Sequence, residues 1–523
     1  PHALACLWSA ESRTLDPRAG GTERLPPGHR WWNHARAFLE ACEADRVDPA
    51  RVVRRVPPGF LGINVNYFLD DDKNAAAQTG GKAPRTVAAA LKEMGVKRLR
   101  YPGGDKSDNH LWSVPPYDRP RPTVLNLGTG QWYRGERKYM TAEGAWIADP
   151  LDFDEFIALC REVGAEPLVV VCLDAAFGTP RPDFTPPSLA RLVETAAAWV
   201  RYANVTKRYG VRDWELGNES YHGEGSDTPT AEEYADAAAR FTKAMKAVDP
   251  AIRIGINGPG HWGTLGAKDR KLGRSTAWWP TVLPAVAPLV DFVVAHTYPC
   301  WQWGSYDYFP AHTPDLGREG TVVAEAIAKG CAPADVARLS IAMTEINAAD
   351  WAKDPDPHWP NVNDLGHALV LADLIGKLLW NPKVENALVW NTRWFGGESP
   401  LSIWNALDKD NGLNPTGQAI AIWNRFLADR IVWTEGTVLV PAYASAGADG
   451  VLNLLLINKG REPRPVDVQL AAAGRAARWR LRGNGPEDPR PVFERAEDVT
   501  PRDGGLALTL EPVSLTILTL PAR

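Results

Sequence analysis

Eight short apolar stretches, separated by mostly helical segments, occupy the chain between Gly59 and about residue 430. Stretches such as "EPLVVVCL" and "LVDFVVAHTYP" are nearly continuous apolar runs, which is typical of strands buried on both faces. Parallel strands need crossover connections, and the segments between these runs have the apolar periodicity of helices. The alternation therefore predicts an α/β fold, a (β/α)₈ barrel whose long loops extend it beyond the typical length of about 250 residues.

The pattern changes after about residue 430. Stretches such as "GVLNLLLINKG" and "AARWRLRG" have the composition of strands, and Gly, Pro and Asp turns separate them without an intervening helical pattern. We therefore expect a C-terminal β-sandwich over 431–523, next to a barrel over 59–430. Residues 1–58 are expected to form an N-terminal extension, partly helical around "WWNHARAFLEACEADR", that packs on the barrel or on the sandwich.

The overall composition argues against two classes of partner. The 523 residues carry a formal net charge of −5, so the chain lacks the basic character that nucleic acid binding requires. It has no unbroken apolar run of about 18 residues, so no membrane span is expected. The chain begins at Pro1, where a signal peptide could already have been removed, so both a secreted and a cytoplasmic location stay open. The oligomeric state is not readable from the sequence.

Tryptophan is the compositional outlier, with 22 copies. Aromatic faces stack on the C–H faces of sugar rings, so this excess favours a carbohydrate cleft, although about two thirds of the tryptophans are expected in the core. The six cysteines are scattered without a CxxC pair, and we expect most of them to be buried free thiols. A Cys6–Cys42 bridge is an alternative that no pattern supports.

Two of the eight predicted strand ends carry a glutamate, and barrel enzymes place their catalytic groups at the carboxyl ends of the strands. Glu219 follows "VRDWELGN" on strand 4, and Glu345 ends "RLSIAMTE" on strand 7, so the two carboxylates are expected to face each other across the barrel mouth. Such a pair suits glycoside hydrolysis, and a separation of about 5–5.5 Å is typical of retaining enzymes. Glu215, in mid-strand, is expected to be an internal ion-pair partner.

Other strand ends supply polar and aromatic residues. Arg100 ends strand 2, His296 and Tyr298 end strand 6, and Trp390 ends strand 8. We expect Arg100 and Tyr298 to hold one carboxylate ionised, while a less polar setting raises the pKa of the other. Asn218 is expected to hydrogen-bond the 2-hydroxyl of a sugar. The chain contains no HExxH, GxSxG or P-loop motif, so other common hydrolytic and phosphate chemistries find no support.

These motifs resemble those of the retaining glycoside hydrolases of clan A, and most closely the family 51 α-L-arabinofuranosidases. "RLRYPGGDKSDNHLW" is similar to the strand-2 signature of that family, and "WELGNES" is similar to its Gly-Asn-Glu motif. The resemblance covers roughly residues 59–430 in motifs, and the sandwich in architecture only. It implies that Glu219 is the acid/base and Glu345 the nucleophile, that Arg100 supports the nucleophile, and that no metal or cofactor is needed. It further implies sugar contacts from Asn218, His296, Tyr298 and Trp390.

The sequence departs from family 51 around the expected sugar pocket. Thr344-Glu345-Ile346-Asn347 replaces the family's Asp-Glu-Trp, and is also similar to the Thr-Glu motif of family 39 β-xylosidases. Asn64 and Asn66 stand where the family carries a substrate-binding Glu, and Asp105-Lys106 replaces a sugar-contacting residue. Further substrate contacts are therefore expected from Asn66, Asp105, Lys106 and Trp301.

The departures leave the sugar open. An arabinofuranosidase-like enzyme acting on an oligo- or polysaccharide is expected first. The alternatives are a β-xylosidase, β-glucuronidase or endo-glycanase of the same clan, acting on a plant, algal or microbial polysaccharide, and an acidic or modified glycan held by Lys106. A non-catalytic carbohydrate-binding protein is a more distant alternative. The insert around 115–150, with Trp132, Tyr133 and Trp146, is expected to add an aromatic wall.

Overall fold

The computed structural model describes residues 44–67, 70, 85–125, 150–180, 182, 184–222, 228–260, 278–311, 316–394, 401–470, 474–501 and 505–521. Residues 1–43 fall outside these ranges, as do Cys6, Cys42 and the three aromatic residues expected to line the 115–150 insert.

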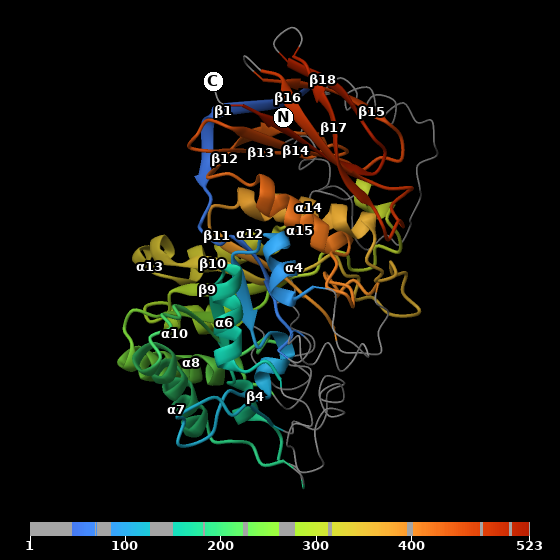
Figure 1. Ribbon diagram of the computed structural model, residues 1–523. Helices are drawn as coiled ribbons and strands as arrows, with labels where there is room; N and C mark the ends of the chain where they lie inside the picture. Colours follow the sequence, from blue (N-terminus) through green and yellow to red (C-terminus); the bar gives the residue numbers. More distant parts are fainter. Residues whose placement is uncertain are drawn as a thin grey trace, which may run out of the picture. The chain divides into compact units, whose positions relative to one another are not determined.

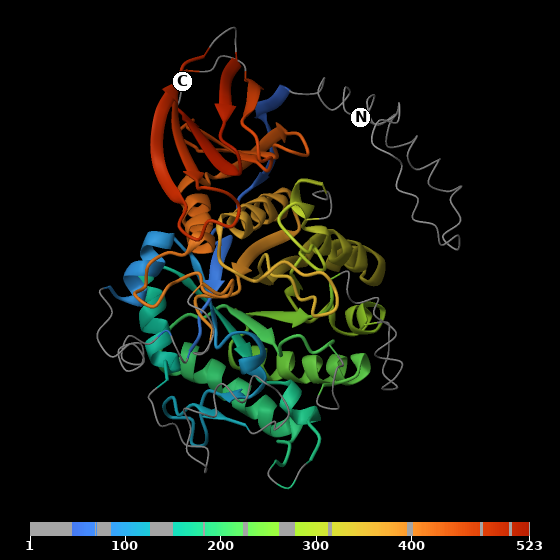
Figure 2. The same cartoon turned by 90° about the vertical axis from the view of Figure 1, so that its right-hand side faces the viewer.

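Eight parallel strands close into a barrel in the order β10-β11-β2-β3-β6-β7-β8-β9, which confirms the predicted (β/α)₈ fold (Figure 1). Helices surround the barrel, as Figure 2 also shows from the side. Small apolar clusters fill the interior, such as Phe292, Val294 and Ala342 from neighbouring strands β9 and β10. The strands are β2 (Leu61–Asn64), β3 (Arg98–Tyr101), β6 (Glu166–Val171), β7 (Asp213–Leu216), β8 (Arg253–Asn257), β9 (Phe292–Thr297), β10 (Ser340–Ile346) and β11 (Val384–Val389).

Helices form in the segments between the strands, as their periodicity predicts, and local capping residues define where several of them begin. The side chain of Asp152 accepts from the backbone N–H of Glu155, whose side chain accepts in return at the start of α6. Thr230 and Glu233 make the same reciprocal pair at the start of α8. The helices are α4 (Val87–Met94), α6 (Phe153–Val163), α7 (Leu189–Val200), α8 (Ala231–Val248), α10 (Trp278–Val286), α11 (Tyr308–Ala311), α12 (Arg318–Gly330), α13 (Pro333–Arg338), α14 (Leu365–Trp380) and α15 (Pro415–Phe426).

Several short elements were not predicted. A π-helical turn over Arg201–Thr206 extends α7, and 3₁₀ turns cover Gly104–Asp108 and Asp174–Phe177. The strands β4 (His110–Leu111) and β5 (Thr123–Val124) pair with each other in the loop after β3. The short helices α10, α11 and α13 lie between longer elements whose apolar periodicity dominates the sequence pattern.

A nine-stranded sheet forms the C-terminal β-domain, in the order β17-β16-β19-β14-β13-β12-β1-β15-β18. Both faces of this sheet are buried along strand β14. Leu454 and Leu456 belong to the core of the β-domain, whereas Leu455 and Ile457 belong to the core shared with the barrel. The strands are β12 (Arg430–Glu435), β13 (Ala442–Ala446), β14 (Leu452–Asn458), β15 (Arg464–Gln469), β16 (Ala476–Arg482), β17 (Val492–Val499), β18 (Gly505–Leu510) and β19 (Ser514–Leu520).

The first strand, β1 (Ala44–Arg55), corrects part of the sequence prediction. The helical stretch was expected to run to residue 46, but the chain is already extended from residue 44 and pairs antiparallel with β12. Arg46 is opposite Glu435, and Arg55 is opposite Arg430. The pairing joins segments that lie almost 400 residues apart, so no local sequence pattern indicates it. The helical periodicity just upstream, in contrast, is a local pattern and dominated the prediction.

Helices α14 and α15 lie between the barrel strands and the β-domain in both ribbon views. Gly376 of α14 allows this close approach, because a Cβ there would lie 2.5 Å from the ring of Tyr443 on β13. A buried ion pair also joins the two parts: Lys459 Nζ lies 2.6 Å from Asp373 Oδ2, and Tyr443 donates its hydroxyl to the same carboxylate. Lys459 Nζ also lies 4.2 Å from the ring centroid of Phe309.

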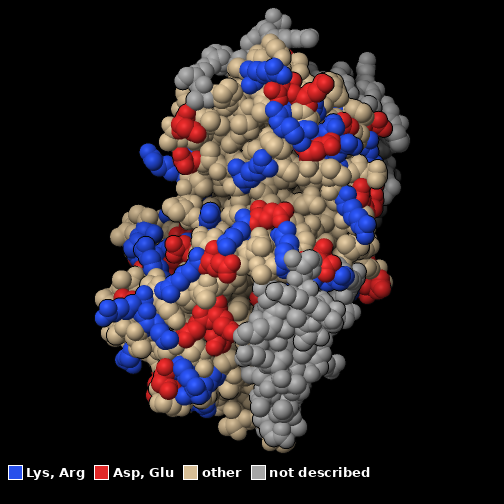
Figure 3. All heavy atoms as spheres, viewed as in Figure 1, with Lys and Arg blue, Asp and Glu red and all other residues tan. Residues whose placement is uncertain are grey.

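The thiols, the lengths of the helices and the surface charges can be compared with what the composition predicted. Cys160, Cys172 and Cys300 are buried free thiols, as predicted, and Cys331 is a partly exposed free thiol. No helix within the described residues is long and apolar enough to cross a membrane. On the face seen in Figure 3, basic and acidic side chains are interspersed over both the barrel and the β-domain.

The buried Lys459–Asp373 pair yields a stability prediction. Asp373→Ala is expected to lower the free energy of unfolding by about 3–5 kcal/mol, because it leaves a buried ammonium group without its counter-charge. Urea denaturation followed by circular dichroism measures this loss. The control is the double variant Asp373→Leu/Lys459→Met, which removes both charges and should recover most of the stability. A single-variant loss below about 1 kcal/mol would contradict a tight pair.

Candidate active site

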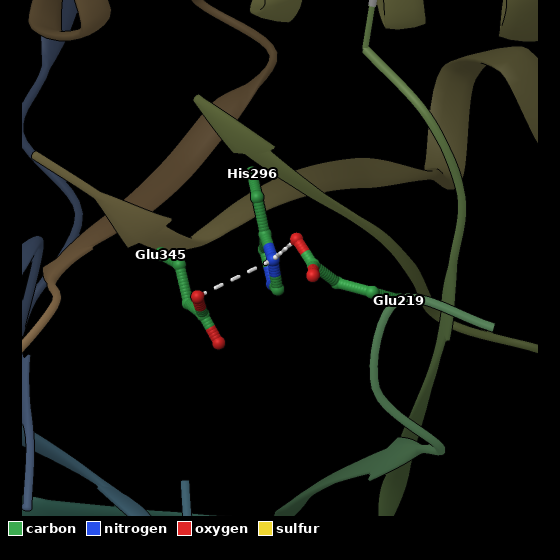
Figure 4. Close-up of side chains that lie close together, drawn as sticks. All are labelled: Glu219, His296 and Glu345. Carbon is green, nitrogen blue, oxygen red and sulfur yellow. Dashed lines mark hydrogen bonds and ion pairs between the residues drawn. The ribbon is translucent and has the colours of Figure 1, made fainter. Parts of the chain in front are cut away.

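The predicted catalytic and positioning residues come together at the carboxyl ends of the barrel strands. Arg100 lies on β3, His296 on β9 and Glu345 on β10, while Glu219 stands three residues beyond the end of β7. Figure 4 shows the His296 imidazole between the two glutamate side chains, with interactions toward both. The arrangement follows directly from the barrel, because parallel strands present all their carboxyl ends at one mouth.

Glu345 receives a donor on each carboxylate oxygen. Arg100 Nη1 lies 2.8 Å from Oε1, and the Tyr298 hydroxyl donates to Oε2 at 2.7 Å. His296 Nδ1 lies 3.6 Å from Oε2. Arg100 comes from β3, whereas His296 and Tyr298 come from β9 and the residue just beyond its end, so the carboxylate is held from two sides of the barrel mouth.

Arg100 is fully buried and connects four side chains. Its Nε and Nη2 donate to both oxygens of Glu215, at 2.9 and 2.7 Å, and Nη2 also donates to Asn218 Oδ1 at 2.8 Å. Nη1 donates to Asn64 Oδ1 at 3.0 Å in addition to Glu345. Burial alone would lower the pKa of Arg100, but the charges of Glu215 and Glu345 raise it. Glu215 is therefore an internal ion-pair partner, as predicted.

Glu219 lies in a more polar setting than the sequence suggested. Its Oε1 accepts from His296 Nδ1 at 2.8 Å and from the Tyr221 hydroxyl at 3.3 Å, and His222 Nε2 lies 3.0 Å from Oε2. Burial would raise the pKa of Glu219, but His222 and His296 outweigh burial and hold the pKa well below its ordinary value of 4.5. The expectation that a less polar setting raises the pKa of this second carboxyl is therefore wrong for this form of the protein.

His296 has the complementary shift. Burial would lower its pKa, but the charges of Glu345 and Glu219 outweigh burial and raise it. Its Nε2 lies 3.0 Å from Thr344 Oγ1, which in turn lies 3.5 Å from Glu215 Oε1. The imidazole is therefore held from both sides, with Nδ1 facing Glu219 and Nε2 facing Thr344.

A tight turn over residues 217–220 aims the Glu219 side chain. Glu219 has a left-handed backbone with φ of +48°, and Gly217 has φ of +69°. A Cβ at Gly217 would lie 2.7 Å from Ser220 Oγ, so glycine is required there. The neighbouring Asn218 N–H donates to Asp108 Oδ1 at 3.2 Å, and Ser220 Oγ donates to Asp174 Oδ2 at 2.9 Å.

The two glutamates are close enough for a direct displacement at one carbon. One carboxylate oxygen of Glu219 and one of Glu345 lie within 4.8 Å of each other, and a nitrogen of His296 lies within the same distance of both. Three such atoms could also hold a cation. A histidine ligand must be neutral, however, and the raised pKa of His296 favours the imidazolium, which donates protons. We interpret the group as an acid–base cluster.

Asp105 is a third carboxyl group at the site. Asn218 Nδ2 donates to its Oδ1 at 3.2 Å, and the residue is partly exposed. Burial, together with the negative charges of Glu219 and Glu345, raises the pKa of Asp105 to about 7. The group is therefore neutral below neutral pH, when it can both donate and accept a hydrogen bond.

Lys106 and Trp390 form one wall of the site. The Lys106 ammonium lies 4.8 Å from the ring centroid of Trp390 and 4.5 Å from that of Trp394, and the residue is only 2% exposed. The ammonium is thus covered by two indoles. The covered ammonium therefore leaves little exposed positive charge with which to bind an acidic glycan.

Two predicted substrate contacts have other surroundings. Asn66 is fully buried and donates from Nδ2 to the Arg393 carbonyl at 3.1 Å. Trp301 is 41% exposed in the loop after β9. A sugar contact by either residue stays a prediction, as do the individual roles of the other site residues.

Sequence reasoning missed His222, Tyr221 and Thr344 as parts of the site. Tyr221 and His222 follow the Gly-Asn-Glu motif directly, so their types alone could have identified them as partners of Glu219. Thr344 was noted only as a flank of Glu345, and its contact with His296 depends on the register between β9 and β10.

Comparison with known proteins agrees with the motifs. The chain is similar to α-L-arabinofuranosidases. It is 29% identical to alpha-L-arabinofuranosidase C of Emericella nidulans over 281 residues, covering 48% of either chain. It is 24% identical over 499 residues to the probable alpha-L-arabinofuranosidase C of Aspergillus clavatus, covering 84% of this chain and 88% of that protein. No protein-family model matches.

The solved structures extend the similarity to the fold. A family 51 α-L-arabinofuranosidase from Bifidobacterium longum superposes with a TM-score of 0.68 at 17% identity, covering 92% of this chain and 99% of that one. The expected resemblance to arabinofuranosidases is thus confirmed. The match to the Emericella protein spans about half of that relative's length.

The raised pKa of Asp105 gives a pH-dependent prediction. The pKa is about 7 in the folded chain against an ordinary value of 3.8, so between these values the folded chain binds the extra proton. The stability of the wild type should therefore fall, relative to Asp105→Asn, as the pH rises from about 4 to about 7, and the difference should level off above that.

Melting temperatures of the wild type and Asp105→Asn, measured by calorimetry between pH 4.5 and 8.5, give this difference. Asp236→Asn, on the exposed face of α8, is the matched control. A difference between wild type and Asp105→Asn that stays constant over the whole range would contradict the raised pKa.

Proposed function

We propose that the protein is a retaining glycoside hydrolase of arabinofuranosidase type that uses Glu345 as nucleophile and Glu219 as acid/base. The observation that carries this proposal is the separation of the two carboxylates, whose nearest oxygens lie within 4.8 Å. Retaining enzymes place the two groups about 5–5.5 Å apart, whereas inverting enzymes leave about 6.5–9.5 Å for a water molecule. The similarity to α-L-arabinofuranosidases over most of the barrel supports the same reaction class.

In the first step, an oxygen of Glu345 attacks the anomeric carbon and forms a glycosyl ester, while the bond to the leaving oxygen breaks. Arg100 and Tyr298 hold the attacking carboxylate in place by one hydrogen bond to each oxygen. The leaving oxygen takes a proton from Glu219. The transition state has positive charge at the sugar, which the surrounding carboxylates stabilise.

His296 holds the proton for this step and transfers it to Glu219. In the resting site the two histidines keep Glu219 ionised, so its Oε1 must gain a proton before it can act as an acid. His296 Nδ1 is 2.8 Å away and can supply it. The negative charge of Glu345 is one cause of the raised pKa of His296. As Glu345 becomes a neutral ester, this attraction is lost and the pKa of His296 falls. The imidazolium then transfers its Nδ1 proton to Glu219, which protonates the leaving oxygen.

In the second step Glu219 acts as a base. It removes a proton from a water molecule, whose oxygen attacks the anomeric carbon and breaks the ester bond to Glu345. The ionised form of Glu219 in the resting site is the form that this step requires. Two displacements at one carbon restore the original configuration.

The neutral walls of the site favour a neutral sugar. Lys106 is covered by Trp390 and Trp394, and Asp105 is uncharged below about pH 7. Asn218 Nδ2 donates one hydrogen bond to Asp105 and has a second N–H that can donate to a sugar hydroxyl. These contacts support a neutral sugar, such as an arabinofuranoside, over a glucuronide.

Replacing the two glutamates should separate their roles. Glu345→Ala is expected to lose activity by at least about 10⁴-fold on every substrate, because no ester can form. Glu219→Ala should lose about 10²–10⁴-fold on glycosides with poor leaving groups, and much less on dinitrophenyl glycosides, which need little protonation. Steady-state kinetics on 2,4-dinitrophenyl and alkyl arabinofuranosides measures the difference.

Glu435→Ala, on the exposed end of β12, is the control for loss of a glutamate elsewhere. Activity retained by both site variants would refute the assignment. Release of nitrophenol by the wild type from aryl arabinofuranoside, xyloside, galactoside, glucoside and glucuronide identifies the sugar. NMR of the first product tests retention, because an inverted anomer would exclude the two-step mechanism.

A further inference from the structure

Two aspartates contact the turn that carries Glu219, and none of the mechanistic steps above uses them. Asp108 ends the 3₁₀ turn that follows β3, and Asp174 begins the 3₁₀ turn that follows β6. The backbone N–H of Asn218 donates to Asp108 Oδ1 at 3.2 Å, and the Ser220 hydroxyl donates to Asp174 Oδ2 at 2.9 Å. The residues directly before and after Glu219 are thus each hydrogen-bonded to one of the two carboxyl groups.

The two carboxyl groups are also hydrogen-bonded to each other. Two carboxylates repel and have no donor between them, so this hydrogen bond requires that one of the two groups keeps a proton. Burial, together with the negative charges of Asp174 and Asp105, raises the pKa of Asp108 well above its ordinary value of 3.8, which agrees with such a proton. We call Asp108 and Asp174 the aspartate pair.

The turn needs support because Glu219 has a left-handed backbone, with φ of +48°. A residue with a side chain rarely adopts this conformation unless the surrounding contacts hold it there. On the β8 side, Asn257 Oδ1 accepts from the Ser220 N–H at 3.0 Å, and Asn257 Nδ2 donates to the Leu216 carbonyl at 2.8 Å. The aspartate pair supplies the contacts from the β3 and β6 side, so the turn is held from both sides of β7.

We propose that Asp108 and Asp174 share one proton and act together as a positioning pair for the acid/base, Glu219. The inference rests on the proposed glycosidase function and adds two residues that act through the turn rather than on the sugar. One proton between the two groups joins them, while each still accepts a hydrogen bond from one side of Glu219. The pair then carries one negative charge instead of two, so it adds less repulsion next to the ionised Glu219.

The pair should matter most for the proton transfer to the leaving oxygen. A shift of the turn moves the carboxyl group of Glu219 relative to that oxygen, and proton transfer requires the two atoms to lie within hydrogen-bonding distance. Glu345 is held separately by Arg100 and Tyr298, so the nucleophile keeps its place. Damage to the pair should therefore slow the cleavage of glycosides whose leaving group needs a proton, and affect the others far less.

Steady-state kinetics on alkyl and 2,4-dinitrophenyl arabinofuranosides tests this role. Asp108→Leu removes the acceptor for Asn218 and the hydrogen bond to Asp174, so kcat/KM should fall at least about tenfold more on the alkyl glycoside than on the dinitrophenyl glycoside. Asp108→Asn should recover most of the loss, because its amide oxygen accepts from Asn218 and its N–H donates to Asp174. Asp213→Asn, in a buried ion pair at the start of β7, is the matched control and should change both substrates by the same factor.

Ser220→Ala provides a milder variant in case the leucine variant does not fold. It removes only the hydroxyl that donates to Asp174 and contacts Asn257, and it should change the same ratio in the same direction by about threefold to tenfold. A loss that is equal on the two glycosides, in Asp108→Leu or in Ser220→Ala, would refute the positioning role.

A second measurement detects the shared proton without turnover. Infrared spectra are compared near neutral pH for three proteins with ¹³C-labelled aspartate: Asp105→Asn alone, which removes the signal of that neighbouring carboxyl, and Asp105→Asn combined with Asp108→Asn or with Asp174→Asn. The first should show the carbonyl stretch of a protonated aspartate that both double variants lack, because in each of them the amide supplies the donor and the remaining carboxyl ionises. If the wild type cleaves none of the glycosides but this band is present, the proposed reaction fails and the shared proton stands. If all three spectra agree, the aspartate pair is refuted.

Discussion

The buried guanidinium of Arg100 is the interaction on which the rest of the site depends. It lies inside the barrel mouth with no exposed surface, and it contacts Asn64 on β2, Glu345 on β10, Glu215 on β7 and Asn218 in the turn after β7. An unpaired charge in this position would cost several kcal/mol, so each partner stabilises the others. Both the expected nucleophile and the expected 2-hydroxyl contact belong to this network. The contacts that stabilise the buried Arg100 therefore also position Glu345 and Asn218.

His296 divides the remaining charge between the two glutamates. It lies within hydrogen-bonding distance of Glu219 and near Glu345, so its proton is attracted by both carboxylates. A change of charge on Glu345 therefore alters the proton affinity of a group that contacts Glu219. Through this shared imidazole, the protonation of Glu219 depends on the charge of Glu345. The coupling is strong because the two glutamates lie close together.

The sequence predicted those features that depend on local pattern. Apolar runs and capping residues define eight strands and most helices, and the barrel rule then places Glu219 and Glu345 at one mouth. Features that depend on distant pairing were not accessible. The low pKa of Glu219 results from His296 on another strand and from the turn that brings His222 back to it. The pairing of β1 with β12, and the contacts of Asp108 and Asp174 with the turn after β7, likewise join segments with no common sequence signal.

Asp105 brings a third carboxyl group into the site. A third carboxyl group beside two glutamates would add repulsion if it were ionised, and the site contains Asp105 in that position. Its pKa of about 7 shows how the repulsion is avoided: the group keeps a proton under mildly acidic conditions. A protonated carboxyl can both accept and donate a hydrogen bond, so it can accept from Asn218 and still donate to a sugar hydroxyl. Because Asp105 keeps a proton, it adds little repulsion to the arrangement of Arg100, His296 and the two glutamates.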